Sequence, residues 1–178
     1  MGHILITGLP GVGKTTLVRE VAHRLSHAHP AGFYTEEIRV RGTRHGFRLV
    51  SLDGRRQILS RTDHGGPYRV GRYGVDVAGF ERLLAELDLR HCPSHLIIID
   101  EIGKMECLSQ RFREEVEALL DSTRTVIATI ALKGDGFIRR VKARPNCRLM
   151  TVTVGNRDHL AGDVATTVRD SLSPQQDQ

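Results

Sequence analysis

The sequence predicts a three-layer α/β fold in which a parallel β-sheet lies between two layers of helices. Two observations support this prediction. Short apolar segments with strand character alternate with amphipathic helical segments through the second half of the chain, which is typical of parallel strands joined by crossover helices. A glycine-rich loop at residues 8–13 also separates the first expected strand from the first expected helix. The 178 residues suffice for one domain with a sizeable core.

The chain begins with an expected strand, loop and helix. Residues 3–7 are apolar and predict a short buried strand. Residues 14–25 carry apolar side chains every three or four positions, so we expect a helix with one buried face. The strand therefore leads through the glycine-rich loop directly into the helix.

The next stretch has the composition of antiparallel strands. Residues 32–40 and 46–52 are rich in β-forming side chains and flank the turn-like residues 41–45, which predicts a β-hairpin. A third short strand is expected near residues 57–60. We interpret these strands as a hairpin insertion, at about residues 32–60, into the α/β domain.

Asp76 follows a loop at residues 63–67 and precedes an apolar helix face. Because aspartate is a favoured N-cap, we expect the helix to start after Asp76 and to bury Phe80, Leu83, Leu84 and Leu87. From here strands and helices alternate along the chain. The expected strands lie at 95–100, 125–130 and 148–154, and the expected helices at 109–120, 136–143 and 156–172.

The chain contains no internal repeat and no linker, so we predict a single domain over residues 1–172, followed by a polar tail at 173–178. The three cysteines, Cys92, Cys107 and Cys147, lack CxxC spacing, which favours free thiols in a reducing cytoplasm. The nine histidines lack the paired spacing of a zinc site. We see no signal-peptide pattern and no apolar run near the roughly 20 residues of a membrane span.

The composition is ordinary for a globular protein, with 39% hydrophobic and 26% charged residues. The net charge of +5 suits a phosphorylated ligand or a nucleic acid. This charge is modest, however, so a merely basic surface is the simpler interpretation. Nucleic-acid binding therefore stays an alternative that the composition does not favour.

The glycine-rich loop matches the phosphate-binding (Walker A) pattern G-x-x-x-x-G-K-[ST] at every position, with Gly8, Leu9, Pro10, Gly11, Val12, Gly13, Lys14 and Thr15. Glycines let backbone N–H groups turn inward around phosphate oxygens, and the helix N-terminus adds its partial positive charge. Lys14 can reach the β- and γ-phosphates, and the Thr15 hydroxyl can bind Mg²⁺. Thr16 is placed to meet the α-phosphate. A glycine loop that merely caps a helix is the weaker alternative, since the flanking strand and helix also match.

Two acids follow the apolar strand segment at residues 96–99. In a parallel sheet the carboxyl ends of the strands face the same crevice as the phosphate-binding loop. Asp100 would hold Mg²⁺ through a water, and Glu101 would be the base that orients and activates the attacking water. An ordinary acidic loop after a strand is the alternative. Because nucleotide kinases often lack this glutamate and need an acceptor pocket, the pair favours hydrolysis over transfer.

Over nearly its whole length the chain resembles the THEP1-type nucleoside-triphosphatases, a family of small P-loop proteins. The most specific carrier of the resemblance is residues 99–106, Ile-Asp-Glu-Ile-Gly-Lys-Met-Glu. The other carriers are the loop at 8–15 and the segments 32–39, 46–47, 70–76, 80–81 and 156–158. The resemblance implies slow, Mg²⁺-dependent hydrolysis of several nucleoside triphosphates, such as ATP and GTP, with loose base preference. It also implies a P-loop NTPase fold with a RecA-like core, in which another strand separates the P-loop strand from the Asp100 strand.

The same motif adds two candidates near Glu101. If the loop bends back over the site, the Lys104 ammonium could neutralise charge that builds on the γ-phosphate. A solvated loop lysine is the alternative. Glu106 could pair with Lys104 or support Glu101.

Four further residues have both a functional and a structural interpretation. Arg72, in a glycine-flanked segment, is either an arginine finger supplied in cis or a surface arginine in a turn. Asn156 and Arg157 either contact the nucleotide base or belong to the cap of the last helix. Thr129 is either a polar sensor of the γ-phosphate or an ordinary strand threonine.

Two basic stretches remain. Arginines on the hairpin, Arg39, Arg41, Arg44 and Arg48, would contact nucleic acid or a partner if they do not simply form a solvated face. The segment 139–148 could act as a basic lid over phosphates.

The sequence therefore leaves three functions open. Our leading prediction is a cytoplasmic, monomeric nucleoside-triphosphatase with Mg²⁺ as its cofactor. A kinase for a nucleotide or another small acceptor is the second. A slow nucleotide switch that signals to RNA or protein is the third.

Overall fold

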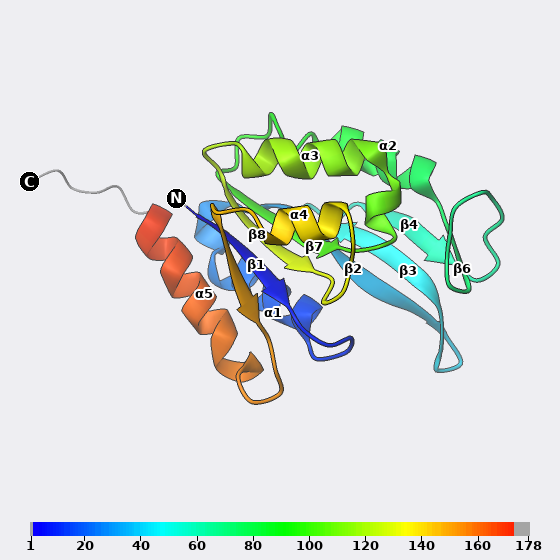
Figure 1. Cartoon of the computed structure of the whole chain (residues 1–178), viewed down its shortest axis with the longest axis horizontal. Coiled ribbons are helices and arrows are strands. Elements are labelled where there is room, and N and C mark those ends of the chain that lie inside the picture. The colour runs from blue at the N-terminus through cyan, green and yellow to red at the C-terminus, as the bar shows by residue number, and fades with distance from the viewer. Residues whose placement is uncertain (1, 173–178) are drawn as a thin grey trace, which may run out of the picture.

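The computed structural model describes residues 2–172, so the expected polar tail at 173–178 lies outside the described residues. A twisted β-sheet runs through the molecule and helices cover both of its faces (Figure 1). The strand order is β5-β6-β4-β3-β2-β7-β8-β1-β9. The predicted three-layer α/β fold is confirmed.

Five neighbouring strands form the parallel half of the sheet: β2 (Ala31–Val40), β7 (Leu96–Ile102), β8 (Thr125–Ile130), β1 (His3–Thr7) and β9 (Cys147–Thr151). In this half β8 lies between β1, which leads into the glycine-rich loop, and β7, which carries Asp100. The RecA-like strand order implied by the family resemblance is therefore present. β7 also runs two residues past the expected end of the strand, through a cis peptide bond between Asp100 and Glu101.

The antiparallel half contains β3 (Thr43–Ser51), β4 (Arg56–Arg61), β5 (Arg69–Val70) and β6 (Tyr73–Val75). The expected hairpin and third strand are present, but the sequence patterns did not predict β5 and β6. These two strands are only two and three residues long, too short to show an alternating pattern.

The expected five-residue turn of the hairpin is wrong. Only Arg41 and Gly42 connect β2 to β3, with φ angles of 48° and 78°. Two successive positive φ angles are the signature of the tight turn that matches the right-handed twist of paired strands. Residues 43–45 therefore belong to β3, where Thr43 and Arg44 pair with Val40 and Arg39 of β2.

The helices divide into two layers (Figure 1). Helices α1 (Lys14–Arg24) and α5 (Arg157–Leu172) pack together on one face and bury their apolar stripes against it. Helices α2 (Val77–Leu87), α3 (Gln110–Leu120) and α4 (Phe137–Lys142) contribute to the core on the other face. Short 3₁₀ turns, η1 (Ser26–Ala28) and η2 (Glu106–Leu108), follow α1 and β7.

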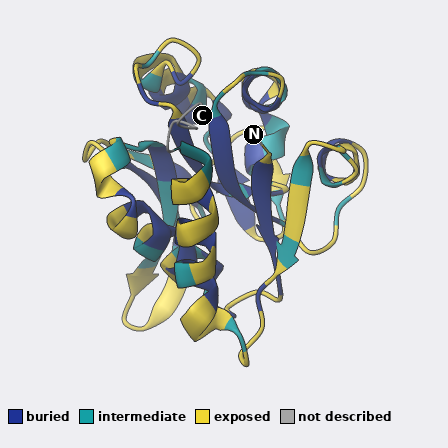
Figure 2. Ribbon diagram, turned by 90° about the vertical axis from the view of Figure 1, so that its left-hand side faces the viewer, coloured by how far each residue is buried: buried dark blue, intermediate teal, exposed yellow. Residues whose placement is uncertain are grey.

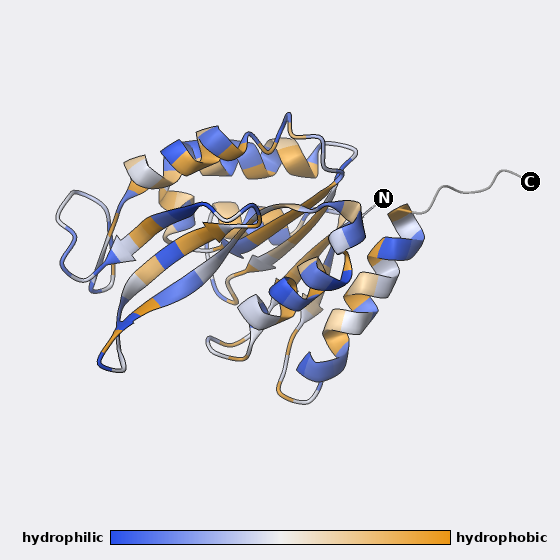
Figure 3. Cartoon of the chain, turned by 180° about the vertical axis from the view of Figure 1, so that it is seen from behind, coloured by the Kyte–Doolittle hydropathy of each residue, from blue (hydrophilic) through white to orange (hydrophobic). Residues whose placement is uncertain are grey.

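Burial follows this layering. The central strands are buried on both faces and the helices expose their outer sides (Figure 2). Apolar residues fill the strands and polar residues cover the helix surfaces (Figure 3). On the α2–α3 face Phe33, Phe80 and Phe112 form an aromatic cluster with ring centroids 5.2–6.3 Å apart. No helix within residues 2–172 combines the length and apolar character needed to cross a membrane.

Two N-caps set the helices on this face. The Asp76 carboxylate accepts a hydrogen bond from the Gly79 N–H at 2.8 Å, so the predicted cap is confirmed. Ser109, expected as the first helical residue, is instead the N-cap of α3, because its hydroxyl accepts from the Phe112 N–H at 3.0 Å. Both caps satisfy backbone donors that the first helical turn leaves free.

Gly32 fixes how closely β2 approaches β7. Its φ is 128°, and a Cβ at this position would lie 1.9 Å from the Ile98 carbonyl oxygen. An L-residue would therefore meet both an unfavourable backbone conformation and a main-chain atom that cannot move away.

We expect Gly32→Ala to lower the free energy of unfolding by about 3 kcal/mol or more, because the new methyl group must push β2 away from β7. Urea denaturation measures this change. Gly65→Ala is the matched control, since a Cβ there meets nothing within 4 Å, and its effect should stay below about 0.5 kcal/mol. Equal stabilities of the two variants would contradict this account of the β2–β7 contact.

Candidate active site

A cavity of about 1020 Å³ lies at the carboxyl ends of the parallel strands. The glycine-rich loop forms one wall, β7 and the loop after it form the middle, and β2 with the antiparallel strands forms the far end. Its lining residues are Gly8, Leu9, Pro10, Gly11, Gly13, Lys14, Thr15, Thr16, Arg19, Thr35, Glu36, Glu37, Arg44, Phe47, Val70, Asp100, Glu101, Gly103, Lys104, Met105, Glu106, Ala131, Leu132 and Lys133. The structure thus brings together the loop, the acid pair and Lys104, which were predicted from distant parts of the sequence.

Backbone conformation shapes the loop as an open cradle. Gly11 and Gly13 have φ angles of 76° and 109°, in the left-handed region that favours glycine. Gly8 needs to be glycine for space, since a Cβ would lie 2.6 Å from the Val152 carbonyl oxygen. Helix α1 then begins at Lys14, so its N-terminal N–H groups face the cavity end of the loop. Val12 does not line the cavity, because its side chain is buried in the α1–α5 core.

Lys14 lies across the mouth of this cradle. Its Nζ donates hydrogen bonds to the main-chain oxygens of Gly8 (3.2 Å) and Leu9 (3.4 Å). The same Nζ lies 3.8 Å from Glu101 Oε2. One ammonium group therefore joins the loop to the acid pair, at a position where an anionic ligand would meet it.

Asp100 is the most constrained polar residue of the cavity, with 1% of its surface exposed. The Thr15 hydroxyl donates to Oδ2 at 2.7 Å, and the Thr129 hydroxyl donates to Oδ1 at 2.5 Å. The Thr35 N–H also donates to Oδ2, at 3.1 Å. Burial raises the pKa of Asp100 above its ordinary value, and these donors oppose that shift by stabilising the carboxylate.

The sequence analysis missed Thr35 and left Thr129 open between a γ-phosphate sensor and an ordinary strand threonine. Thr129 is fully buried, bonds to Asp100 and does not line the cavity, so its hydroxyl is not directed at the γ-phosphate position. Thr35 also donates its hydroxyl to the Asp100 main-chain oxygen at 2.5 Å. Neither contact has a sequence signal, because each depends on which strands are neighbours of β7.

Glu101 extends into the cavity with about a third of its side chain (32%) exposed. Burial raises the pKa of its carboxyl above the ordinary value, and the Lys14 ammonium opposes this shift. A carboxylate in this setting accepts a proton more readily than an exposed glutamate. It lies beside the lysine that the loop pattern assigns to phosphate binding.

Lys104 and Glu106 both line the cavity but lie in different environments. Lys104 is exposed, whereas Glu106 is 6% exposed at the start of η2. Of the two alternatives for Glu106, the pair with Lys104 is absent from the ion pairs of residues 2–172, and support of Glu101 stays open. Burial and the neighbouring acids Glu101 and Asp100 raise the pKa of Glu106 to about 8.

Asn156 and Arg157, which lie between β9 and the first turn of α5, do not line the main cavity. Asn156 uses its side chain on the backbone, accepting from the Thr153 N–H (2.7 Å) and donating to the Thr151 oxygen (2.9 Å). The Arg157 stem lies beside Gly13, since its Cδ would be 3.9 Å from a Cβ there. The Asn156 side chain therefore stabilises the loop that precedes α5, whereas Arg157 adjoins the phosphate-binding loop.

Arg72 lies in the turn between β5 and β6 and does not line the cavity. Its Nη2 donates to the main-chain oxygen of Arg44 (2.7 Å) and to the Tyr73 hydroxyl (3.1 Å). It therefore supports Arg44, which lines the far end of the cavity together with Phe47 and Val70. The sequence placed Arg44 only in a basic stretch, because the long-range fold of the hairpin decides which side chains face the site.

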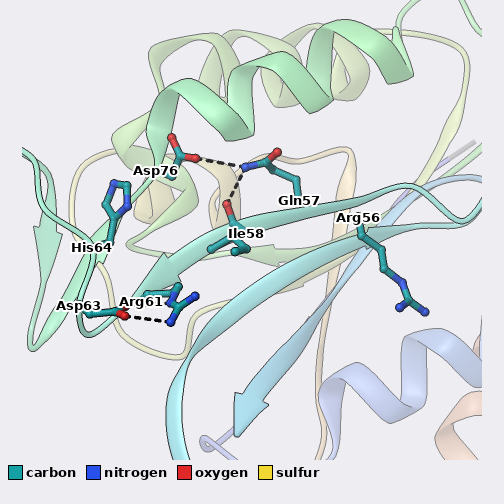
Figure 4. A pocket seen from close by; sticks show the side chains of 7 residues that line it. All are labelled: Arg56, Gln57, Ile58, Arg61, Asp63, His64 and Asp76. Atoms are coloured by element: carbon teal, nitrogen blue, oxygen red, sulfur yellow. Dashed lines mark hydrogen bonds and ion pairs between the residues drawn. The ribbon is translucent and has the colours of Figure 1, made fainter. Parts of the chain in front are cut away.

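A second, shallower cavity of about 520 Å³ lies by β4 and the start of α2 (Figure 4). Four of its seven lining residues already bond to one another. Gln57 donates to Asp76, and Arg61 pairs with Asp63 (Figure 4). It is thus less suited to bind a ligand than the cavity around the loop.

The oxygen atoms around Asp100 suit a hard cation such as Mg²⁺. Thr15 Oγ1 and Asp100 Oδ2 are 2.7 Å apart in the main cavity, and Mg²⁺ prefers such carboxylate and hydroxyl oxygens. Residues 2–172 contain no group of three or more His, Cys, Asp or Glu side chains that could hold a metal ion alone. An ion here would need phosphate oxygens as further ligands, which is usual for Mg²⁺.

Comparison with known proteins yields consistent relatives. A family model described as NTPase matches residues 3–165. The protein named nucleoside-triphosphatase THEP1 of Thermotoga petrophila is 48% identical over 162 residues, which cover 90% of this chain and 89% of that protein. The cancer-related nucleoside-triphosphatase of Homo sapiens is 40% identical over 185 residues, covering 95% of this chain and 97% of its own.

Solved structures show the same fold. The crystal structure of THEP1 from Aquifex aeolicus aligns with a TM-score of 0.85 and 37% identity, covering 93% of this chain and 98% of its own. The solution structure of a human cancer-related nucleoside triphosphatase aligns with a TM-score of 0.84 and 38% identity, covering 97% and 100%.

The raised pKa of Glu106 predicts a pH-dependent stability. Its folded pKa of about 8 exceeds the ordinary 4.5, so the unfolded chain ionises first and stability falls as pH rises from about 4.5 to 8. We expect Glu106→Gln, which cannot ionise, to escape this loss. Its advantage over the wild type should grow by roughly 3 kcal/mol between pH 4.5 and pH 7. Urea denaturation at both pH values measures it, and a constant difference would contradict the assignment.

Proposed function

Since the chain belongs to the THEP1-type nucleoside-triphosphatase family, we propose that it hydrolyses nucleoside triphosphates to diphosphates and free phosphate. The observation that carries the proposal is the position of Glu101. Its carboxylate lies in the same cavity as the glycine-rich loop, 3.8 Å from the Lys14 ammonium. A base for water is thus next to the group expected to bind the terminal phosphates.

Phosphate binding is the first part of the proposal. The N–H groups around Gly11 and Gly13 and the N-terminus of α1 would surround the β-phosphate, with Thr16 near the α-phosphate. Lys14 would exchange its contacts with the Gly8 and Leu9 oxygens for β- and γ-phosphate oxygens. Because the ammonium is already held at the loop, the Lys14 side chain loses little further conformational freedom when it binds phosphate.

We propose Mg²⁺ as the cofactor, held by Thr15 and Asp100. Mg²⁺ at such a site neutralises negative charge on the β- and γ-phosphates. Thr129 on β8 and Thr35 on β2 orient the Asp100 carboxylate through their hydrogen bonds to it. Positioning by buried groups keeps the carboxylate in one geometry, and this precision is typical of catalytic sites.

Glu101 would act on the water. In the step we propose, the water oxygen attacks the γ-phosphorus and the bond to the β–γ bridging oxygen breaks, leaving the electron pair on the diphosphate. The water proton passes to the Glu101 carboxylate, whose raised pKa favours accepting it. Lys14, and Lys104 from the loop over the cavity, would stabilise the charge that spreads on the transferring phosphoryl group.

Loose base preference is part of the proposal. Asn156 and Arg157 are the candidates to contact the base, and the Asn156 amide already bonds to the Thr151 and Thr153 backbone. Discrimination between bases needs unpaired donors and acceptors that face the base edge. Arg157 beside Gly13 can contact phosphate or ribose without reading the base.

A kinase is the second candidate, favoured by one observation. The cavity continues past Glu101 to Arg44, Phe47 and Val70, which offer a cation and apolar surface to an acceptor. Incubation with γ-labelled ATP and a panel of nucleosides and monophosphates separates the two functions. Label in free phosphate without any acceptor supports hydrolysis, whereas label that moves only to an added acceptor supports the kinase.

We expect Lys14→Ala and Glu101→Gln each to lower the rate of phosphate release from ATP, GTP, CTP and UTP by about 100-fold or more. The two variants should differ in binding. Lys14→Ala should weaken affinity for the triphosphate, since it removes a phosphate contact, and Glu101→Gln should leave the affinity within about threefold. Released phosphate and equilibrium binding measure these effects. A wild-type rate in Glu101→Gln would exclude Glu101 as the base.

A further inference from the structure

Glu106 is a buried acid that the proposed hydrolysis does not yet use. It begins η2, lines the main cavity and is 6% exposed. The neighbouring acid in the same cavity is Glu101. A Cβ on Gly103 would lie 2.7 Å from Glu106 Oε2 and 3.1 Å from Glu101 Oε1, so the two carboxyl groups face each other across this glycine within about 6 Å.

The surroundings of Glu106 favour a neutral carboxyl. Within residues 2–172 it forms no ion pair, and the ionisable groups that act on it are Glu101 and Asp100 from β7. The Cys107 thiol lies next to it, and burial together with the charge of Glu106 raises the pKa of that thiol to about 12, so it remains protonated near neutral pH. A buried carboxylate without a cation is unfavourable, because neither water nor a counter-ion stabilises its charge.

A neutral Glu106 carboxyl both accepts and donates hydrogen bonds. The backbone N–H groups of Glu106 and Gly103 lie near it and oppose the rise in its pKa, because they favour the carboxylate. A neutral carboxyl can accept from such groups and still donate a hydrogen bond through its O–H. The donor can therefore be directed across Gly103 toward Glu101.

Glu101 needs such a donor during catalysis. In this structure its ion-pair partner is Lys14, at 3.8 Å, and Lys142 of α4 also acts on its charge, with a smaller effect than Lys14. In the proposed function the Lys14 ammonium binds phosphate oxygens of the substrate. The Glu101 carboxylate then loses Lys14 as its ion-pair partner. Hydrogen bonds between catalytic groups often shorten only when the substrate binds, and Glu106 is the neighbouring carboxyl, on the other side of Gly103, that can replace Lys14.

We propose that Glu106 is a positioning residue that acts as a neutral acid and donates a hydrogen bond to Glu101, holding its carboxylate toward the attacking water. The inference rests on the proposed hydrolysis. Glu106 keeps its own proton throughout, and the proton taken from water goes to Glu101. A neutral donor suits this role, since an ionised Glu106 would repel the base and raise the charge next to the γ-phosphate.

The role predicts opposite results for two substitutions. Glu106→Gln keeps the size and a neutral N–H donor, so its kcat for ATP should stay within about threefold of the wild type. Glu106→Ala removes the donor and should lower kcat by about 10- to 100-fold with little change in KM. In a Glu101→Gln background, Glu106→Ala should cause no further loss, because both changes affect the same step.

The matched control is Glu115→Gln in α3. Glu115 is also buried, at 5% exposed, but it pairs with Arg90 at 3.2 Å and lies away from the cavity. Its turnover should equal that of the wild type. Circular dichroism and thermal melting establish that each variant folds. If Glu106→Ala does not fold, the rates of Glu106→Gln and their pH dependence decide between the outcomes.

The pH profile separates a positioning role from a merely structural one. The wild type should lose activity as pH rises through about 8, where Glu106 ionises, and Glu106→Gln should lack this loss. The proposal is overturned if Glu106→Gln is as slow as an active-site knockout, if folded Glu106→Ala turns over at the wild-type rate, or if both profiles coincide. Failure of the proposed hydrolysis would look different, since the wild type itself would then release no phosphate from ATP.

Discussion

The hydrogen bonds around the buried Asp100 carboxylate hold the site together. Their donors are Thr15 at the start of α1, Thr35 on β2 and Thr129 on β8, and Asp100 itself lies on β7. One side chain thus joins three strands and the helix that follows the glycine-rich loop. Because an unpaired buried carboxylate is highly unfavourable, the three donors must be present together, and this requirement fixes the loop relative to the sheet.

The parts of the site that follow from local chemistry could be predicted from the sequence. The glycine loop, Lys14 and the acids after an apolar strand each have a pattern within a few residues, as does the Asp76 cap. The contacts of Thr35 and Thr129 could not be predicted, because a threonine in a strand has no pattern that reveals its neighbours. The two-residue turn at Arg41 was missed for a related reason, since a non-glycine residue at positive φ is uncommon.

The arginines of the antiparallel strands show how structure changes the meaning of composition. Arg39 and Arg44 both pair with Glu37, and Arg48 pairs with Glu36. A surface that looks basic in sequence is therefore partly neutralised by its own acids, which lowers the charge available to a nucleic acid there. These pairs also hold Arg44 at the far end of the cavity, where its position matters more than its contribution to net charge.

Strand β2 belongs to both halves of the sheet, parallel to β7 on one side and antiparallel to β3 on the other. Thr35 touches Asp100, and the next two residues of β2 hold the hairpin arginines through their carboxylates. The hairpin tip is therefore connected to the buried Asp100 carboxylate along a single strand, β2. The pairing of this strand with β3 has one irregularity, between Ile38 and Arg39, so a change at the tip reaches the centre of the site by way of this bulge.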